Sequence, residues 1–213
     1  NGTTALKIDT STIRGDLALT TGAAITDDGT VTVLANLTAT TNDNDGAITL
    51  GTLAVTGTVG VTTNGGGNAT LVNADGLNFA ASNVGGALDA TATLGTLIDT
   101  GAITVAGVSA FTTSAQDANI LLDSTNALTG AVTLTTATAG GNTGDASINN
   151  GTTALAIDTS TISGDLALTT GAAITDDGTV TVLANLTATT NDNDGAITLG
   201  TLAVTGTVGV TTN

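Results

Sequence analysis

The sequence predicts an all-β protein, a parallel β-helix (β-solenoid) in which short strands stack as turns of one rod. Three observations predict it: a long internal repeat, a shorter strand-and-turn pattern inside that repeat, and a composition that favours strands and tight turns over helices. We expect about 20–34 residues per turn and six turns in each repeat of 149 residues.

The long repeat is visible when the chain is compared with itself. Residues 1–64 recur as residues 150–213, and only two positions differ: Lys7 is replaced by Ala156, and Arg14 by Ser163. We therefore expect one continuous solenoid segment over 1–213, with one full repeat in 1–149 and the start of a second copy in 150–213. Since the chain starts at Asn1 without a Met, we expect it to be an excerpt of a larger protein.

The shorter pattern reads aliphatic, any, Gly or Ala, any, apolar, any, apolar, Thr, usually Thr. It starts at Ile13, Val33, Val55, Val84, Val105 and Leu128, and again at Ile162, Val182 and Val204. Successive starts within the first repeat lie 20, 22, 29, 21, 23 and 34 residues apart. We expect the two long spacings to hold loops, NGGGNAT and AGGNTGDASINN, that bulge from the rod.

Alternation along each strand predicts which side chains form the core, because successive side chains point to opposite faces. Leu17 and Leu19 are expected inside, whereas Arg14, Asp16 and Thr20 are expected in water. The same rule predicts further inward pairs: Leu37 and Ala39, Val59 and Val61, Leu88 and Ala90, Ser109 and Phe111, Val132 and Leu134. The two substitutions between copies, at Lys7 and Arg14, then fall where water is expected.

Composition narrows the function. The chain has no Cys, His, Pro, Met, Trp or Tyr, so most side chains that carry chemistry at neutral pH are missing, and we do not expect an enzyme. All 18 acidic residues are Asp against 2 basic residues, and the net charge of -16 disfavours nucleic acid and anionic membranes as partners. No apolar run approaches the roughly 18 residues of a membrane span.

The stretch GDLALTTGAAITDDGTVTVLANLTATT, in which a Gly, a short apolar strand, a Gly-containing turn and a second strand recur, resembles the filamentous-haemagglutinin-like giant surface adhesins of bacteria. The resemblance extends over the whole chain. It implies a right-handed parallel β-helix, secretion, an extracellular location at the cell surface, and adhesion or filament formation. It supplies no catalytic residue.

The acidic loop TNDNDG, at 41–46 and again at 190–195, is a candidate calcium site. It places Asp43 and Asp45, and in the second copy Asp192 and Asp194, two residues apart before a Gly, and hard cations take several oxygen ligands. An Asx-rich turn that is held by its own hydrogen bonds is the alternative. No other cofactor is expected.

A stacked file of threonines is a second candidate feature. Thr20, Thr40, Thr62, Thr91, Thr112 and Thr135 occupy one motif position and are expected to line one outer face. Ice binding needs a second regular file, and the position two residues earlier holds Ala18, Thr38, Gly60, Asp89, Ala110 and Thr133, so an exposed strand surface is the simpler interpretation.

Carbohydrate-cleaving β-helix enzymes are the enzymatic alternative, but the Asp residues are scattered over turns rather than clustered. We therefore expect a rod-like stalk or filament of a giant secreted repeat protein. A self-assembling sheath, fibre or surface layer bridged by calcium is the alternative. The expected partners are neighbouring repeats, copies of the chain side by side, and host surfaces or other cells reached through modules outside this segment.

Overall fold

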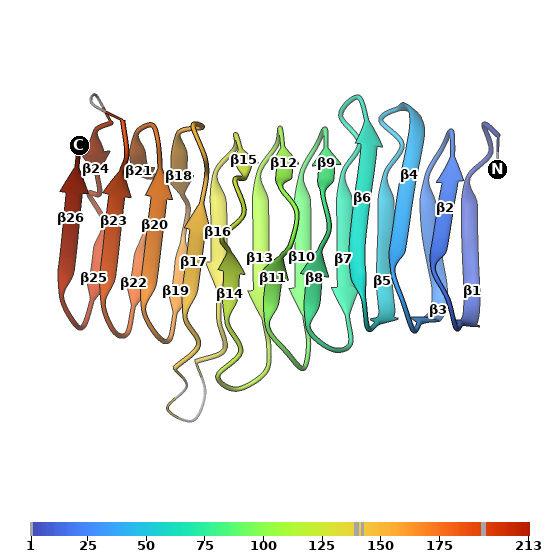
Figure 1. Cartoon of the computed structure of the whole chain (residues 1–213), viewed down its shortest axis with the longest axis horizontal. Coiled ribbons are helices and arrows are strands. Elements are labelled where there is room, and N and C mark those ends of the chain that lie inside the picture. Colours follow the sequence, from blue (N-terminus) through green and yellow to red (C-terminus); the bar gives the residue numbers. More distant parts are fainter. Residues whose placement is uncertain (1, 139–140, 142, 193–194) are drawn as a thin grey trace.

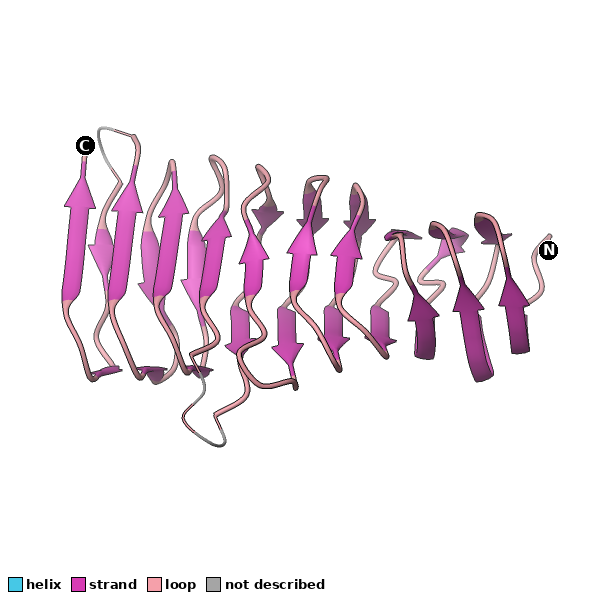
Figure 2. Ribbon diagram, turned by 60° about the horizontal axis from the view of Figure 1, so that its bottom comes forward, coloured by secondary structure: helices cyan, strands magenta, loops and turns pink. Residues whose placement is uncertain are grey.

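The computed structural model shows a rod of stacked β-coils (Figure 1), and it describes residues 2–138, 141, 143–192 and 195–213. Two parallel 13-stranded sheets run along the rod, and the chain passes from one to the other in every turn, with no helix in the described ranges. Figure 2 shows the two layers of strands with loops at both corners. The predicted parallel β-solenoid is confirmed.

Sheet A is built from 13 strands: β1 (Leu6–Ile13), β3 (Ile25–Val33), β5 (Ile48–Val55), β7 (Ala69–Asn73), β10 (Leu88–Ala92), β13 (Ser109–Thr113), β16 (Val132–Thr135), β18 (Leu155–Ile157), β19 (Ser160–Ile162), β21 (Ile174–Asp176), β22 (Val180–Val182), β24 (Ile197–Thr198) and β25 (Leu202–Val204). Sheet B is built from the other 13: β2 (Leu17–Thr21), β4 (Leu37–Asn44), β6 (Thr58–Asn64), β8 (Leu77–Phe79), β9 (Ser82–Val84), β11 (Leu97–Asp99), β12 (Ile103–Val105), β14 (Ile120–Leu122), β15 (Ala127–Leu128), β17 (Ala146–Asn149), β20 (Leu166–Thr170), β23 (Leu186–Thr190) and β26 (Val208–Thr212).

Each regular coil consists of a long strand or a pair of short strands, then a corner, then a strand of four to eight residues. We call this last strand the Thr-Thr strand because it covers the positions at which the motif ends. In turns 1–3 the first part lies in sheet A and the Thr-Thr strand in sheet B, as in β1 and β2. In turns 8–10 the arrangement is the same, as in β18, β19 and β20.

Between these groups the arrangement is inverted, because two additional single strands each insert half a turn. After β6 the chain forms β7 in sheet A, so the next pair, β8 and β9, falls in sheet B and the Thr-Thr strand β10 in sheet A. After β16, the strand β17 in sheet B restores the first arrangement. We call β7 and β17, with their flanking corners, the half-turn switches.

The switches correct two predictions. The segments NGGGNAT and AGGNTGDASINN were expected to bulge as loops, but β7 starts in the first and β17 lies in the second, each paired on both sides. Residues 139, 140 and 142 of the second segment lie outside the described residues, so the loop prediction is corrected for the part from 143 on. The repeat therefore has seven turns rather than six, since β1 recurs as β18 seven coils later. Turns have about 21 residues, at the short end of the expected 20–34, and seven of them rise about 34 Å at the usual strand spacing of about 4.8 Å.

The core is a continuous column of aliphatic side chains between the two sheets. Leu17 in the first coil is partly buried, and the other predicted inward residues are buried: Leu19, Leu37, Ala39, Val59, Val61, Leu88, Ala90, Val132 and Leu134, with Ser109 beside Phe111. The two Phe side chains, Phe79 and Phe111, meet edge to face with centroids 6.4 Å apart. The register places like residues above one another, as in Leu17↔Leu37↔Val59, and this stacking holds neighbouring turns together.

Candidate functional site

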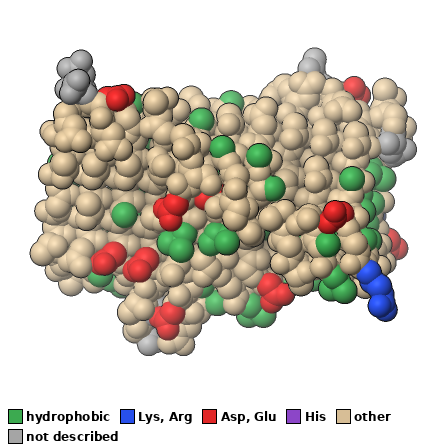
Figure 3. Space-filling view, viewed as in Figure 1, with side chains coloured by type: hydrophobic (Ala, Val, Ile, Leu, Met, Phe, Trp, Pro, Cys, Tyr) green, Lys and Arg blue, Asp and Glu red, His purple; other side chains and the backbone are tan. Residues whose placement is uncertain are grey.

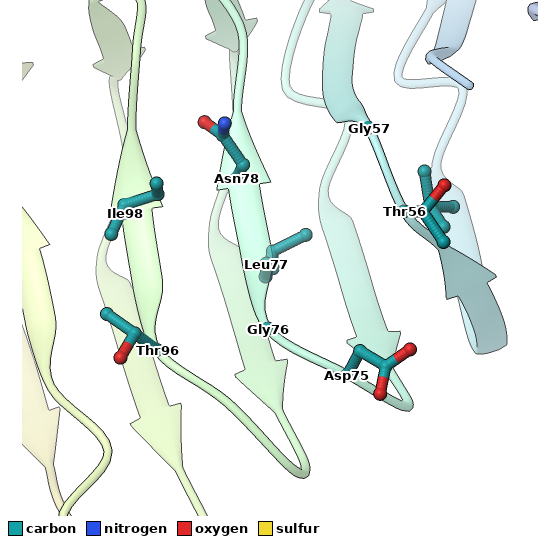
Figure 4. A pocket seen from close by; sticks show the side chains of 9 residues that line it. Thr56, Gly57, Asp75, Gly76, Leu77, Asn78, Thr96 and Ile98 are labelled. Carbon is teal, nitrogen blue, oxygen red and sulfur yellow. The ribbon is translucent and has the colours of Figure 1, made fainter. Parts of the chain in front are cut away.

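One described groove lies at the first half-turn switch, a region that the sequence pattern did not predict. It has a volume of about 370 Å³ and is lined by residues from three successive coils, including Thr56, Asp75, Asn78 and Thr96. Figure 4 shows the Asp75 carboxylate on the corner between β7 and β8. Two more grooves, of about 280 and 380 Å³, border the same region, lined by Leu53 and Val72 and by Ser82 and Thr104.

These grooves offer little chemistry. The first contains a single carboxylate among hydroxyl, amide and aliphatic groups, and the second is mainly apolar. A carbohydrate-cleaving site would need two carboxyl groups that face each other across the groove. The signal for the region was in the sequence: Ala69, Leu71 and Asn73 alternate like a strand, although the Thr-Thr ending is missing.

Hydrogen-bonded ladders tie successive coils together at the corners. In one, Asn36 N donates to Asp16 Oδ1 (3.0 Å) and Thr58 N donates to Asn36 Oδ1 (3.0 Å). A longer ladder runs through five coils, in which each residue's backbone N–H donates to the Oδ1 of the one before, over 2.8–3.0 Å: Asn119, Asp145, Asp165, Asn185 and Thr207. Because every link joins two turns, the ladders resist their separation.

A second type of corner clamp is repeated in both copies. Asp27 accepts from Gly51 N (3.0 Å) and Thr52 N (2.7 Å), and Asp176 accepts from Gly200 N (2.7 Å) and Thr201 N (2.6 Å). The hydrogen bond from Gly200 N, followed by those from Thr201, lowers the pKa of the Asp176 carboxyl although burial opposes this. The charged form is therefore the one that the fold stabilises.

The predicted calcium loop is stabilised by contacts to its neighbours. Asp43 N donates to Gly22 O, and the Asp43 carboxylate lies against Gly22 in the preceding turn. Asp45 Oδ1 instead accepts from Gly66 N of the following turn (2.6 Å), so the two carboxylates serve different coils.

In the second copy Asp192 lies against Gly171, and Asp194 falls outside the described residues. Within the described ranges, no three acidic, His or Cys side chains gather as a metal-binding group. Calcium at this loop stays a prediction.

The predicted single file of threonines is wrong, and the half-turn switch is the reason. Thr20, Thr40 and Thr62 stack in sheet B, where the next position is Asn83. Thr91, Thr112 and Thr135 stack in sheet A on the opposite side, and that file continues through Thr161 and Thr181. Each side of the rod thus carries its own short Thr columns.

Buried polar side chains were a further feature that the alternation rule did not resolve. The second Thr of the motif points inward and bonds the corner carbonyl, as Thr41 Oγ1 does to Gly46 O (2.7 Å). Asn73, Asn126 and Asn150 are also buried, and each bonds backbone atoms of the preceding coil. These side chains satisfy backbone groups at places where the ladder is interrupted.

The surface is mostly uncharged, as the face in Figure 3 shows, with acidic groups scattered over it and basic groups only at the end where the chain begins. The ion pair between Lys7 Nζ and Asp28 spans 2.5 Å. The hydrogen bond to Lys7 lowers the pKa of Asp28, and the same contact raises the pKa of Lys7. The second copy has Ala156 in place of Lys7 and cannot form this pair.

Comparison of the sequence with protein-family models gives a match over most of these coils. A family model described as repeats of unknown function (DUF5649) matches residues 1–43, 66–135 and 143–194. The chain belongs to this family. The matched parts of this DUF5649 chain include both half-turn strands, β7 and β17. No curated protein and no solved structure matched the chain. No helix capable of crossing a membrane is present in the part of the chain that the structure describes.

Proposed function

We propose that this chain is a non-enzymatic, rod-like stalk segment of an extracellular adhesin at the cell surface. The observation that carries the proposal is the uninterrupted stacking of ten coils, with one core and two continuous parallel sheets. In such an array each coil contacts only its neighbours, so added repeats lengthen the rod without changing its cross-section. That property suits a spacer that holds a binding module away from a surface.

The inter-turn ladders support a mechanical role. Side chains of the corners, such as Asp165 and Asn185, bond backbone groups of adjacent coils in addition to the sheet hydrogen bonds. The net charge of -16 supports an exposed setting, because like charges keep rods soluble and apart. The absence of Cys, His and Tyr from the sequence supports a role without catalysis.

A second candidate, lateral assembly into a sheath or surface layer, is favoured by the small neutral side chains on the outer face of β2, β4 and β6. Its exposed or partly exposed positions hold Ala18, Thr20, Thr38, Thr40 and Thr62, whereas Gly60 is buried and Asp43 is exposed near the end of β4. Small neutral side chains allow two such faces to approach without charge repulsion, which the corner aspartates would otherwise cause.

Electron microscopy and sedimentation velocity of the purified chain, with calcium or with a chelator, discriminate between these candidates. About 5 mM calcium is used because it saturates a site with a dissociation constant of roughly 0.1–1 mM, as in extracellular modules. The stalk predicts single rods about 48 Å long, at about 4.8 Å per coil, under both conditions. Ordered side-by-side assemblies would contradict the stalk and support the layer. Antibodies against the chain should label intact cells, and labelling only after lysis would contradict the surface location.

A further inference from the structure

The residue that follows the first aliphatic of the motif sits at the corner before each Thr-Thr strand, and we call it the corner residue. In coils that follow a regular coil it is exposed: Leu34 is 53% exposed and its counterpart Leu183 is 46% exposed. Thr56, Ala106 and Thr129 are exposed as well. At such corners the chain accepts side chains of very different size and polarity.

After a half-turn switch the corner residue is enclosed instead. Ser163, which follows β17, is 5% exposed. Its N–H donates to Thr136 Oγ1 (2.8 Å), and its Oγ accepts from Gly144 N (3.0 Å) and lies 3.0 Å from Thr136 Oγ1. The segment that enters β17 therefore covers this corner.

The first switch shows the same geometry independently. Gly85 follows β7, and its N–H donates to Thr63 Oγ1 (2.9 Å), as Ser163 does to Thr136. A Cβ at Gly85 would lie too close to Gly65 O of the inserted segment to be accommodated. Both switches thus require a very small corner residue in the coil that follows them, because backbone of the inserted half-turn occupies the space.

Arg14 is the counterpart of Ser163 in the other copy of the repeat, and it does not meet this requirement. An arginine at the Ser163 corner would bring a long charged side chain into a space that Thr136 and Gly144 already fill, and a buried unpaired charge is costly. The substitution at this position was predicted to lie in water, and for Ser163 that prediction is wrong.

We propose that the size of the corner residue determines which type of coil can lie directly before a copy of the repeat in the stack. A copy with serine at this corner docks onto a half-turn switch of the β17 type, whereas a copy with arginine fits only onto a coil edge that leaves the corner open. The recognised partner is thus the edge formed by Thr136 and Gly144, and its specificity is steric. The second difference between the copies, Lys7 against Ala156, lies on an outward position and takes no part in it.

The test compares Ser163→Arg with Leu183→Arg, which places the same side chain at the same motif position one coil later, where the corner is open. Amide hydrogen exchange is measured over 143–150, together with the melting temperature. We expect exchange in Ser163→Arg to be at least roughly tenfold faster in this segment, or the variant not to fold, while Leu183→Arg behaves like the parent chain. Equal behaviour of the two variants, in either direction, would overturn the proposal.

Ser163→Gly separates size from hydrogen bonding, since glycine is the residue found at the first switch. We expect it to keep most of the protection. A loss in Ser163→Gly as large as in Ser163→Arg would show that the hydroxyl rather than the space decides, and would refute the steric selection. Ala156→Lys, the other difference between the copies, serves as a further control and should change neither measurement.

Discussion

Asn73 offers the sharpest test of how the half-turn switch is anchored. It is 1% exposed at the end of β7, and its Oδ1 accepts from Val55 N (2.8 Å) while its Nδ2 donates to Val55 O (3.0 Å) and Gly76 O (2.6 Å). Val55 is 2% exposed, so no solvent replaces these bonds when the side chain is truncated.

The loss of stability expected for Asn73→Ala follows from the backbone groups that would be left without a hydrogen-bond partner. Asn73→Ala deprives the Val55 N–H and at least one carbonyl of their hydrogen bonds, and each unsatisfied buried group costs about 1–3 kcal/mol. We therefore expect the variant to lose about 3 kcal/mol of unfolding free energy. Asn83→Ala, at an exposed position of β9 in the other sheet, is the matched control and should stay within about 0.5 kcal/mol of the parent.

Urea denaturation followed by circular dichroism gives both values, and hydrogen exchange at Val55 reports the local opening. A loss for Asn73→Ala no larger than for Asn83→Ala would refute the reasoning that this amide replaces interrupted ladder bonds between β5 and β7. An increase in exchange confined to residues far from Val55 would refute it as well.

Two other predictions concern a valine that occurs in both copies of the repeat and an aspartate whose pKa is lowered. Val59 is 0% exposed, and its counterpart Val208 is 48% exposed. Urea denaturation should therefore show that Val59→Ala loses about 1.6 kcal/mol or more of unfolding free energy, at about 0.8 kcal/mol for each of the two carbons removed, and that Val208→Ala loses about half as much. Equal losses would contradict the difference in burial. The lowered pKa of Asp176 means that its contribution is present above the unfolded pKa and lost as pH falls through the lower folded value. The parent should therefore melt above Asp176→Asn at pH 7, with the gap closing in acid below about pH 4, and a gap that widens in acid would contradict this sign.

Much of the fold could be predicted from the sequence because strand alternation is a local property. Leu37, Val59 and Phe111 are buried where the period of two places them. The number of turns could not be predicted from the motif alone, because the half-turns of β7 and β17 contain no copy of the motif by which turns were counted. Their own alternation, as in Ala69, Leu71 and Asn73, was the available signal.

The predictions about individual surface positions depended on the number of turns in the repeat. Thr62 and Thr91 share a motif position, but the inserted half-turn sends them to opposite sheets, and no local pattern records such an offset. The enclosure of Ser163 has the same origin, since its neighbours Thr136 and Gly144 come from the preceding coil. Contacts between coils depend on how many residues separate them, and a motif read within one coil does not contain that information.

The two half-turn switches have an evolutionary consequence. The two half-turns add up to one full turn. Gain or loss of whole 149-residue units therefore changes the length of the rod but not the side on which later Thr-Thr strands lie. Duplication of a stretch with only one half-turn switch would rotate every later coil by half a turn about the axis of the rod. A repeat unit with two half-turn switches therefore keeps all later coils in the same orientation, whatever the number of copies.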